Sequence, residues 1–204
     1  MHKITTIAEL EAIYNIKPAL AAMAKEIDYI APAYQNMINL SPFIALATIG
    51  PEGLDCSPRG DLAGFVKILD SKTLAMPDRR GNNRVDSLRN IVADPRVALL
   101  FLIPGSGTTF RVNGRAYLTT DHDLCASFTV EEKPARCVII VKVETCYFQC
   151  ARAILRSGLW DGSKHVAKNA ISSTGEVLES LTKGEINAAE YNRDWPGRAK
   201  TSMW

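Results

Sequence analysis

Apolar residues recur with two different spacings along the chain, and the change of spacing separates helical regions from strand-forming ones. Residues 1–40 have a helical pattern that Pro18 and Pro32 divide into two or three short helices. Thr6 followed by Glu9 has the spacing of a capping box, which predicts that the first helix begins there. The following residues form one apolar stripe: Ile7, Leu10, Ile13 and Tyr14. This region is expected to be a helical cap or a dimer-packing element.

From residue 43 the pattern changes to short strands separated by turn signals. Thr109–Leu118 alternates between apolar and polar side chains, whereas Val97–Ile103 is continuously apolar, which is typical of a strand buried on both faces. Asp55–Asp61 follows the Gly50–Gly53 turn, on or just after the second strand of a hairpin. A helix is expected at Val85–Ala93. The other expected strands are Phe43–Ile49, Phe65–Leu69, Thr73–Met76, Cys137–Val143 and Thr145–Cys150.

This order of elements favours a mainly β fold, because most of the strands follow one another through turns instead of alternating with helices. The pattern predicts an antiparallel β-barrel with flanking helices. The expected organisation is one domain, residues 1–204, with a helical N-terminal extension (1–40) and a helical C-terminal extension (151–204).

Composition excludes several classes of protein. The chain has 204 residues, of which 47% are hydrophobic and 23% charged, and these values are typical of a globular protein. The net charge of +2 and the 7% of aromatic residues do not favour nucleic-acid binding. No apolar run is long enough to cross a membrane, and the first residues do not resemble a signal peptide. Five scattered cysteines without a CxxC pair favour reduced thiols in the cytoplasm and no metal site.

The most informative segment is Pro77–Asn90, PDRRGNNRVDSLRN, in which arginines alternate with glycine and asparagine between an expected strand and an expected helix. Guanidinium groups, amides and the free N–H groups of a helix start are the donors that a phosphate dianion requires. A solvated basic loop is the alternative, but the strand–loop–helix context favours an anion site. The arginines are Arg79, Arg80, Arg84 and Arg89.

Two further polar sets lie on strands. Ser57, Arg59 and Asp61 alternate along the chain and would point to one face, as expected for a polar groove. Arg111, Asn113 and Arg115 also share one strand face, which would meet either solvent or a ligand or subunit. Together with the arginine-rich segment Pro77–Asn90, these residues predict a small organic phosphate as ligand.

Several segments carry a resemblance to a known family. They are SPRGD (Ser57–Asp61), the arginine loop (Pro77–Ile91), DPRVALLF (Asp94–Phe101), RVNGRA (Arg111–Ala116) and CARAILRSGLW (Cys150–Trp160). On these motifs the chain resembles the pyridoxamine 5'-phosphate oxidase-related flavoproteins, an FMN-binding split-barrel family, and in particular a branch regarded as FMN-dependent. The resemblance implies a split-barrel homodimer with two FMN molecules at the subunit interface.

The same resemblance implies a set of cofactor-binding residues but no catalytic residue. Arg59, Arg84 and Ser87 would hold the FMN phosphate, and the flavin ring would lie near Ser57–Asp61 and Asp78–Arg79. Arg111 and Asn113 would come from the strand across the groove, and the segment around Arg156 and Trp160 would close the site from the partner subunit. The implied set is Ser57, Arg59, Gly60, Asp61, Asp78, Arg79, Arg80, Asn82, Asn83, Arg84, Ser87, Arg111, Asn113, Arg156 and Trp160.

The function that the resemblance implies is an FMN-dependent oxidoreductase that transfers hydride between FMN and a small organic substrate or NAD(P)H. The alternatives are a non-catalytic flavin-binding or carrier protein and a relative that binds F420 or haem. Genuine pyridoxamine-phosphate oxidases have a C-terminal Arg-x-His motif, which is missing here, since His165 is followed by Val-Ala-Lys. Oxidation of vitamin B6 is therefore not expected.

Overall fold

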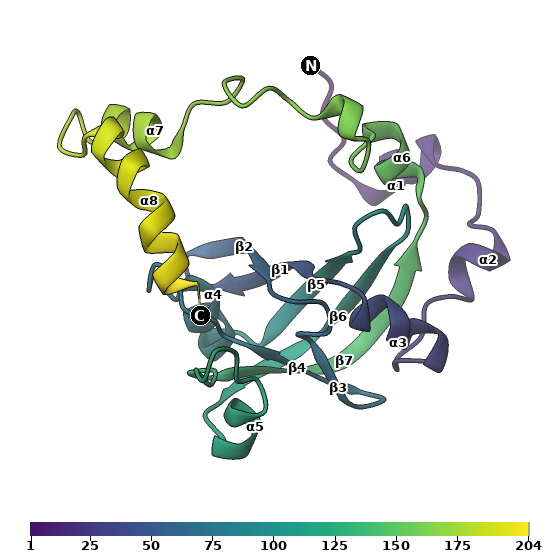
Figure 1. The fold of residues 1–204 in the computed structure, drawn as a ribbon. Coiled ribbons are helices and arrows are strands. Elements are labelled where there is room, and N and C mark those ends of the chain that lie inside the picture. The colour runs from purple at the N-terminus through teal and green to yellow at the C-terminus, as the bar shows by residue number, and fades with distance from the viewer. Residues whose placement is uncertain (204) are drawn as a thin grey trace.

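The computed structural model describes residues 1–203, and Trp204, the last residue of the expected C-terminal extension, lies outside the described residues. A single seven-stranded antiparallel sheet, in the order β2-β1-β5-β6-β7-β4-β3, forms a strongly curved core (Figure 1). The strands are β1 (Phe43–Gly50), β2 (Gly53–Gly60), β3 (Lys67–Asp70), β4 (Thr73–Pro77), β5 (Arg96–Leu102), β6 (Thr109–Thr119) and β7 (Val138–Gln149). Because β2 and β3 end the order without pairing with each other, the barrel is split. The prediction of a mainly β antiparallel fold with flanking helices is confirmed.

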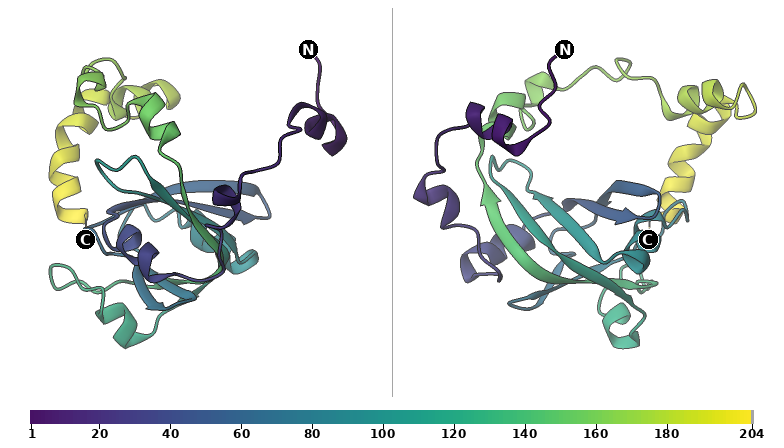
Figure 2. Two further views of the ribbon diagram at one scale, coloured as in Figure 1. Left: turned by 90° about the vertical axis from the view of Figure 1, so that its right-hand side faces the viewer. Right: turned by 180° about the vertical axis from the view of Figure 1, so that it is seen from behind.

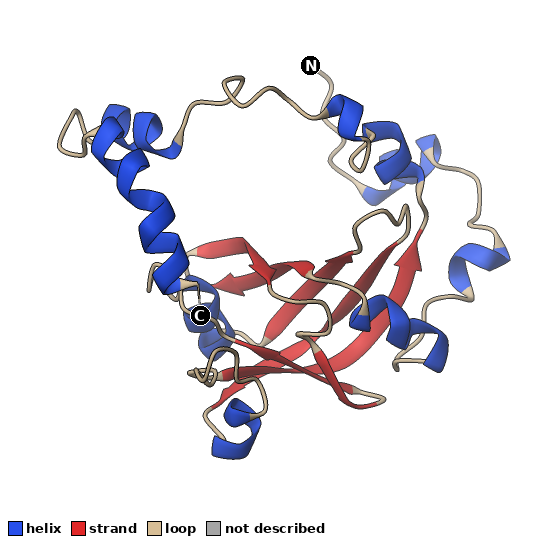
Figure 3. Ribbon diagram, viewed as in Figure 1, coloured by secondary structure: helices blue, strands red, loops and turns tan. Residues whose placement is uncertain are grey.

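The helices lie around the sheet and in the two extensions (Figure 3). They are α1 (Ile7–Ile13), α2 (Leu20–Met23), α3 (Pro32–Asn39), α4 (Asp86–Ala93), α5 (His122–Ala126), α6 (Arg152–Ser157), the 3-10 helix η1 (Gly162–Lys164), α7 (Thr174–Leu181) and α8 (Ala188–Ser202). Figure 2 shows that the N-terminal segment projects away from the sheet, and Figure 1 shows that α8 runs from the distant α7 back toward the sheet and ends near α4. Among residues 1–203, no helix is both long and apolar enough to cross a membrane.

The first helix forms as its sequence predicts but contributes nothing to the core. Both halves of the capping box are present, with the Glu9 amide donating to Thr6 Oγ1 at 3.2 Å and the Glu9 carboxylate accepting from the Thr6 amide at 3.1 Å. However, α1 contains no buried residue, and Ile7 is 69% exposed. The apolar stripe therefore has no partner among residues 1–203.

The core fills the concave side of the sheet. Ile44, Phe101 and Phe110 stand opposite one another on β1, β5 and β6, and none of the three is exposed. Directly opposed residues of an antiparallel pair point to the same side of the sheet, so this row defines the inner face. The row continues onto β2, where Arg59 pairs with Ile44. The polar residues of β2 that share this parity therefore face the barrel interior.

Two strand predictions were wrong. The segments Cys137–Val143 and Thr145–Cys150 form one strand, β7, because a β-bulge opposite Gly114 leaves Glu144 without a paired residue and the ladder then continues. A side chain on Gly114 would collide with the carbonyl of Lys142, so the close approach of β6 and β7 requires glycine. Strand β5 is buried on only one face, since the outward residues Ala98, Leu100 and Leu102 are half-buried.

Candidate functional site

A polar pocket of about 520 Å³ lies where β2 meets the segment that follows β4. This volume is within the usual range of small-molecule sites. Its lining comes from Asp55 and Ser57–Arg59 of β2, from the whole of Asp78–Ser87, and from Arg136. The expected cofactor-binding residues that it brings together are Ser57, Arg59, Asp78, Arg79, Arg80, Asn82, Asn83, Arg84 and Ser87.

Arg59 has unused hydrogen-bonding capacity at the centre of this pocket. Its Nη1 lies 3.4 Å from the Asp78 carboxylate, and both side chains are largely buried. Among residues 1–203, its Nε is a buried nitrogen without a hydrogen-bond partner. Burial raises the pKa of Asp78, and the charges of Arg59 and Arg136 oppose that rise. A buried donor without an acceptor is costly, which favours a ligand that supplies one.

A second ion pair joins the same two segments and is structural. Arg79 Nε lies 2.6 Å from the Asp61 carboxylate, which is 2% exposed, and Arg79 Nη1 donates to the carbonyl of Phe128 at 2.7 Å. These contacts tie the end of β2 to the loop after β4 by side chains, where the sheet provides no backbone pairing. Asp61 and Gly60 do not line the pocket, although the resemblance included both.

The loop before α4 is held in a compact turn by its asparagines. The Arg84 amide donates to Asn82 Oδ1 at 3.1 Å, and Asn83 and Val85 adopt left-handed backbone angles, with φ of 65° and 56°. Arg84 Nε donates to Asp86 at 2.7 Å, and the Arg84 side chain is 74% exposed. The turn thus places a guanidinium group beside the start of α4, where a helix attracts anions.

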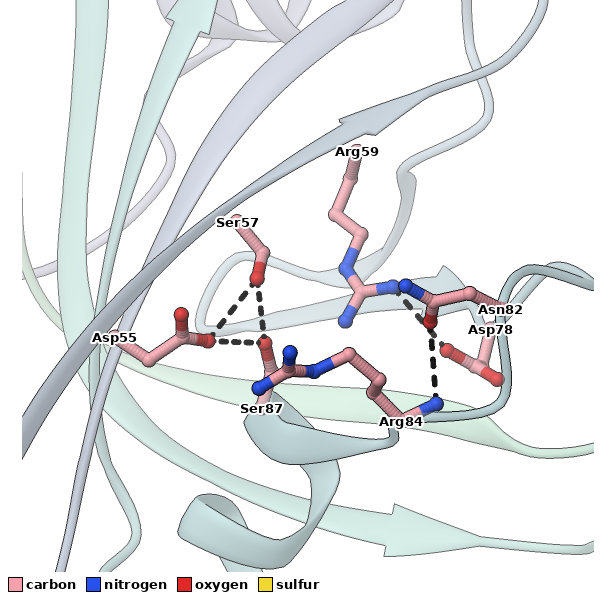
Figure 4. Close-up of polar contacts among 7 residues, drawn as sticks. All are labelled: Asp55, Ser57, Arg59, Asp78, Asn82, Arg84 and Ser87. Atoms are coloured by element: carbon pink, nitrogen blue, oxygen red, sulfur yellow. Dashed lines mark hydrogen bonds and ion pairs between the residues drawn. The ribbon is translucent and has the colours of Figure 1, made fainter. Parts of the chain in front are cut away.

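Asp55 is a functional candidate that the sequence interpretation missed. Its Oδ2 accepts hydrogen bonds from Ser57 Oγ at 3.0 Å and from Ser87 Oγ at 2.7 Å, and Ser87 Oγ also lies 3.1 Å from Ser57 Oγ (Figure 4). The hydrogen bond from Ser87, more than any other contact, holds the pKa of Asp55 below its usual value. The sequence did contain a signal for Asp55, because the alternation that places Ser57 and Arg59 on one face of the strand extends two residues back to Asp55.

Arg136 was also missed, and no local pattern would have revealed it. It lies just before β7, and the Asp78 amide donates to the carbonyl of its neighbour Cys137 at 2.9 Å. This long-range contact brings Arg136 to the pocket.

Besides Gly60 and Asp61, four more expected residues are not brought to this pocket. Arg111 and Asn113 lie on the outer face of β6, where Arg111 is opposite Leu100 and donates to the Tyr147 hydroxyl at 3.1 Å. Ser57 is on the inner row, so these residues lie on opposite faces of the sheet. Trp160 Nε1 donates to the carbonyl of Ser106 at 2.7 Å, and Arg156 is exposed in the last turn of α6.

Within residues 1–203, no cluster of three or more His, Cys, Asp or Glu side chains could hold a metal ion. The polar groups that line the pocket are arginine, amide, hydroxyl and carboxylate groups.

Comparison with known proteins gives one family match. The profile of the family described as pyridoxamine 5'-phosphate oxidase matches residues 30–150, about three fifths of the chain. No curated protein sequence matches.

Solved structures similar to the chain include HupZ from Group A Streptococcus, with 17% identity and a TM-score of 0.49 over 59% of this chain and 99% of that one. General stress protein 26 from Bacillus anthracis has 17% identity and a TM-score of 0.42, covering 56% of this chain and 88% of that one. An F420 reductase has 20% identity and a TM-score of 0.42, covering 59% and 98%.

Proposed function

The chain belongs to the pyridoxamine 5'-phosphate oxidase family, and from this premise we propose that it is an FMN-dependent oxidoreductase that transfers hydride between FMN and a small organic molecule or NAD(P)H. The observation that carries the proposal is the pocket of about 520 Å³ in which the arginine loop faces the buried, unpaired Nε of Arg59. A phosphorylated, planar and hydrogen-bonding cofactor suits this donor set.

The residues present fit a flavin phosphate. Arg80 and Arg84 would hold the phosphate together with the amides of the Asn82–Asn83 turn, because these cations are exposed at the pocket and the turn is already fixed by its own hydrogen bonds. Arg59 would donate to an acceptor at the buried end of the pocket. Its position is set by Asp78, which keeps one Nη group occupied.

Bound FMN would supply the hydride-accepting chemistry, and the chain would supply binding and orientation. Arg59 and Arg79 are the cations nearest the expected ring position, but Arg79 has the shorter ion pair, 2.6 Å from Asp61 against 3.4 Å between Arg59 and Asp78, and Arg59 alone has an unpaired Nε. Arg59 therefore provides the positive charge that would favour extra electron density on a ligand. The scheme requires no acid–base residue from the chain.

We include a homodimer in the proposal. The outer face of β1, β2 and β5 is apolar and incompletely covered, with Phe43 at 40% and Leu54 at 84% exposure. Arg111 and Asn113 border this face, so pairing of two such faces would bring them toward a second subunit. Arg156 and Trp160 would reach the partner's site in the same arrangement. Two-fold dimers are the commonest solution for such surfaces, and size-exclusion chromatography with light scattering tests this part.

Among the alternatives, haem suits this pocket least. The residues that line it include no His, Cys, Met or Tyr, which are the usual axial ligands of haem iron. F420 also has a ribityl chain and a phosphate, although that phosphate is a diester with a single negative charge, and it would use the same donors. A cytoplasmic location belongs to the proposal and is supported by five cysteines that are all free.

The experiment is spectroscopic. Protein purified without added cofactor is expected to show the flavin absorbance, with FMN as the ligand that mass spectrometry identifies after release. Bleaching of that absorbance by NADH or NADPH, followed by its return in air, would support an oxidoreductase. Bound FMN that neither nucleotide nor any organic donor reduces would favour a flavin carrier, and a deazaflavin mass would favour F420.

A further inference from the structure

A smaller pocket of about 210 Å³ adjoins the one described above. We propose that this pocket, here called the side pocket, binds the carboxylate or phosphate group of a second, acidic small molecule that occupies the site together with FMN. This inference rests on the proposed function and names the substrate class of the same site. The lining residues are Asp78, Arg79, Arg80, Lys133, Pro134 and Arg136.

The charges of the side pocket favour an oxyanion. Arg80, Lys133 and Arg136 supply three cations, and within residues 1–203 none of these three side chains forms a hydrogen bond or an ion pair. Asp78 is the one carboxylate among the described lining residues, and Arg59 Nη1 already lies 3.4 Å from it. Like charges around one small cavity repel one another, and an oxyanion would relieve that repulsion and accept their hydrogen bonds.

The size and burial of the side pocket suit one charged end of a molecule. Its volume is below the usual range of pockets that enclose a whole ligand. The side chains of Asp78 and Arg79 are only 15% and 17% exposed, whereas Arg80, Lys133 and Arg136 are exposed residues. The three free cations therefore stand where an anion arrives from solvent, and their positive charge would attract it.

The turn that carries Lys133 is strained. Val130 and Lys133 exchange backbone hydrogen bonds of 3.1 and 2.9 Å, which closes a two-residue turn. Both residues within the turn, Glu131 and Glu132, adopt left-handed φ angles, of 48° and 62°. Such turns usually contain asparagine, aspartate or glycine, because other residues are strained there. The turn fixes the backbone of Lys133 beside the side pocket, and strain of this kind clusters at ligand sites.

Contacts between distant segments hold the two walls of the side pocket together. Arg79 Nη1 donates to the carbonyl of Phe128 at 2.7 Å, and the Asp78 amide donates to the carbonyl of Cys137 at 2.9 Å. The segment that contains Lys133 is therefore anchored on both sides. Lys133 and Pro134 line only the side pocket, whereas the other four residues also line the larger one. Lys133 thus distinguishes a second ligand from FMN.

The test titrates anions into the full chain after it has been saturated with FMN. Isothermal titration at constant ionic strength uses inorganic phosphate and, separately, acetate, and at least one of the two should bind at one site per chain. Lys133→Ala should raise the Kd of that anion about 10-fold, which is the low end for the loss of one charged hydrogen bond. Lys133→Arg should retain the wild-type affinity, and neither variant should change the Kd for FMN.

The matched control is Lys168→Ala. Lys168 is exposed in the segment between η1 and α7 and lies outside both pockets. Its replacement removes the same charge and should change neither affinity. An equal loss of anion affinity in Lys168→Ala and Lys133→Ala would overturn the inference, because the effect would then be one of net charge.

The outcomes separate this inference from the proposed function. The side pocket is refuted if neither anion binds, if FMN abolishes the binding, or if Lys133→Ala leaves it unchanged. Tighter binding of acetate would assign the oxyanion to a carboxylic acid, and tighter binding of phosphate would assign it to a phosphate ester; both results support the side pocket. Protein that binds no FMN but binds either anion through Lys133 would count against flavin as the cofactor and leave the side pocket supported.

Discussion

Replacement of Arg84 by alanine gives the sharpest test of the phosphate site, because this side chain contributes little to the stability of the fold. It is 74% exposed and its ion pair with Asp86 is also at the surface. Surface pairs of this kind contribute about 0–1 kcal/mol to folding. The free energy of unfolding of Arg84→Ala should therefore stay within about 1 kcal/mol of the wild type, so a loss of binding would not reflect unfolding.

The effect on FMN should be much larger than the effect on stability. A hydrogen bond to a charged group contributes about 1.5–3 kcal/mol, which corresponds to a rise of about 10- to 150-fold in the Kd for FMN. Riboflavin has no phosphate and should bind the variant and the wild type equally. Quenching of flavin fluorescence measures both dissociation constants, and purified variant protein should be visibly less yellow.

The matched control is Arg193→Ala in α8, since Arg193 pairs with its neighbour Asp194 at similar exposure and lies outside the pocket. It should leave both affinities unchanged. If FMN bound the Arg84→Ala variant as tightly as the wild type, or if riboflavin lost as much affinity as FMN, the arginine loop would not be the phosphate site.

Other predictions concern the fold itself. Val85 has a φ of 56°, which is strained for a β-branched residue, so Val85→Gly should raise Tm by about 2–4 °C in a thermal melt, and a lower Tm would contradict the strain. Phe101 is fully buried, so Phe101→Ala should cost about 3–5 kcal/mol in urea unfolding, and a loss below about 1 kcal/mol would contradict its place in the core. Hydrogen bonds from Arg96 lower the pKa of Asp94 to about 2. A lowered pKa in the folded state stabilises the protein at pH values above the unfolded pKa of about 4. The wild type should therefore have a higher free energy of unfolding than Asp94→Asn, by an amount that is constant above pH 4 and shrinks as the pH falls toward 2. A difference that does not change over this range would argue against the pairing.

Local patterns in the sequence predicted correctly those structural features whose physical cause lies within a few neighbouring residues. The capping box at Thr6 depends on two residues three positions apart, and it forms although α1 contains no buried residue. The alternation of Thr109–Leu118 and the turn before β2 likewise predicted their strands. The arginine loop was located correctly between a strand and a helix, because its glycine and asparagines and the following helix start are adjacent in the chain.

The pairing of strands determined which face each side chain occupies and which distant residues meet, and local patterns could not predict either. Alternation shows which residues of β6 share a face but not which face is buried. The register of β6 with β5, and of β1 with β5 and β2, places Arg111 on the outer face of the sheet and Ser57 on the inner face. The bulge that joins two expected strands into β7 depends on how closely β6 approaches it. Asp55 acquires its two serine donors, and Arg136 its place at the pocket, through contacts between segments distant in the sequence. Such contacts depend on long-range packing, which the spacing of residues along one segment does not encode.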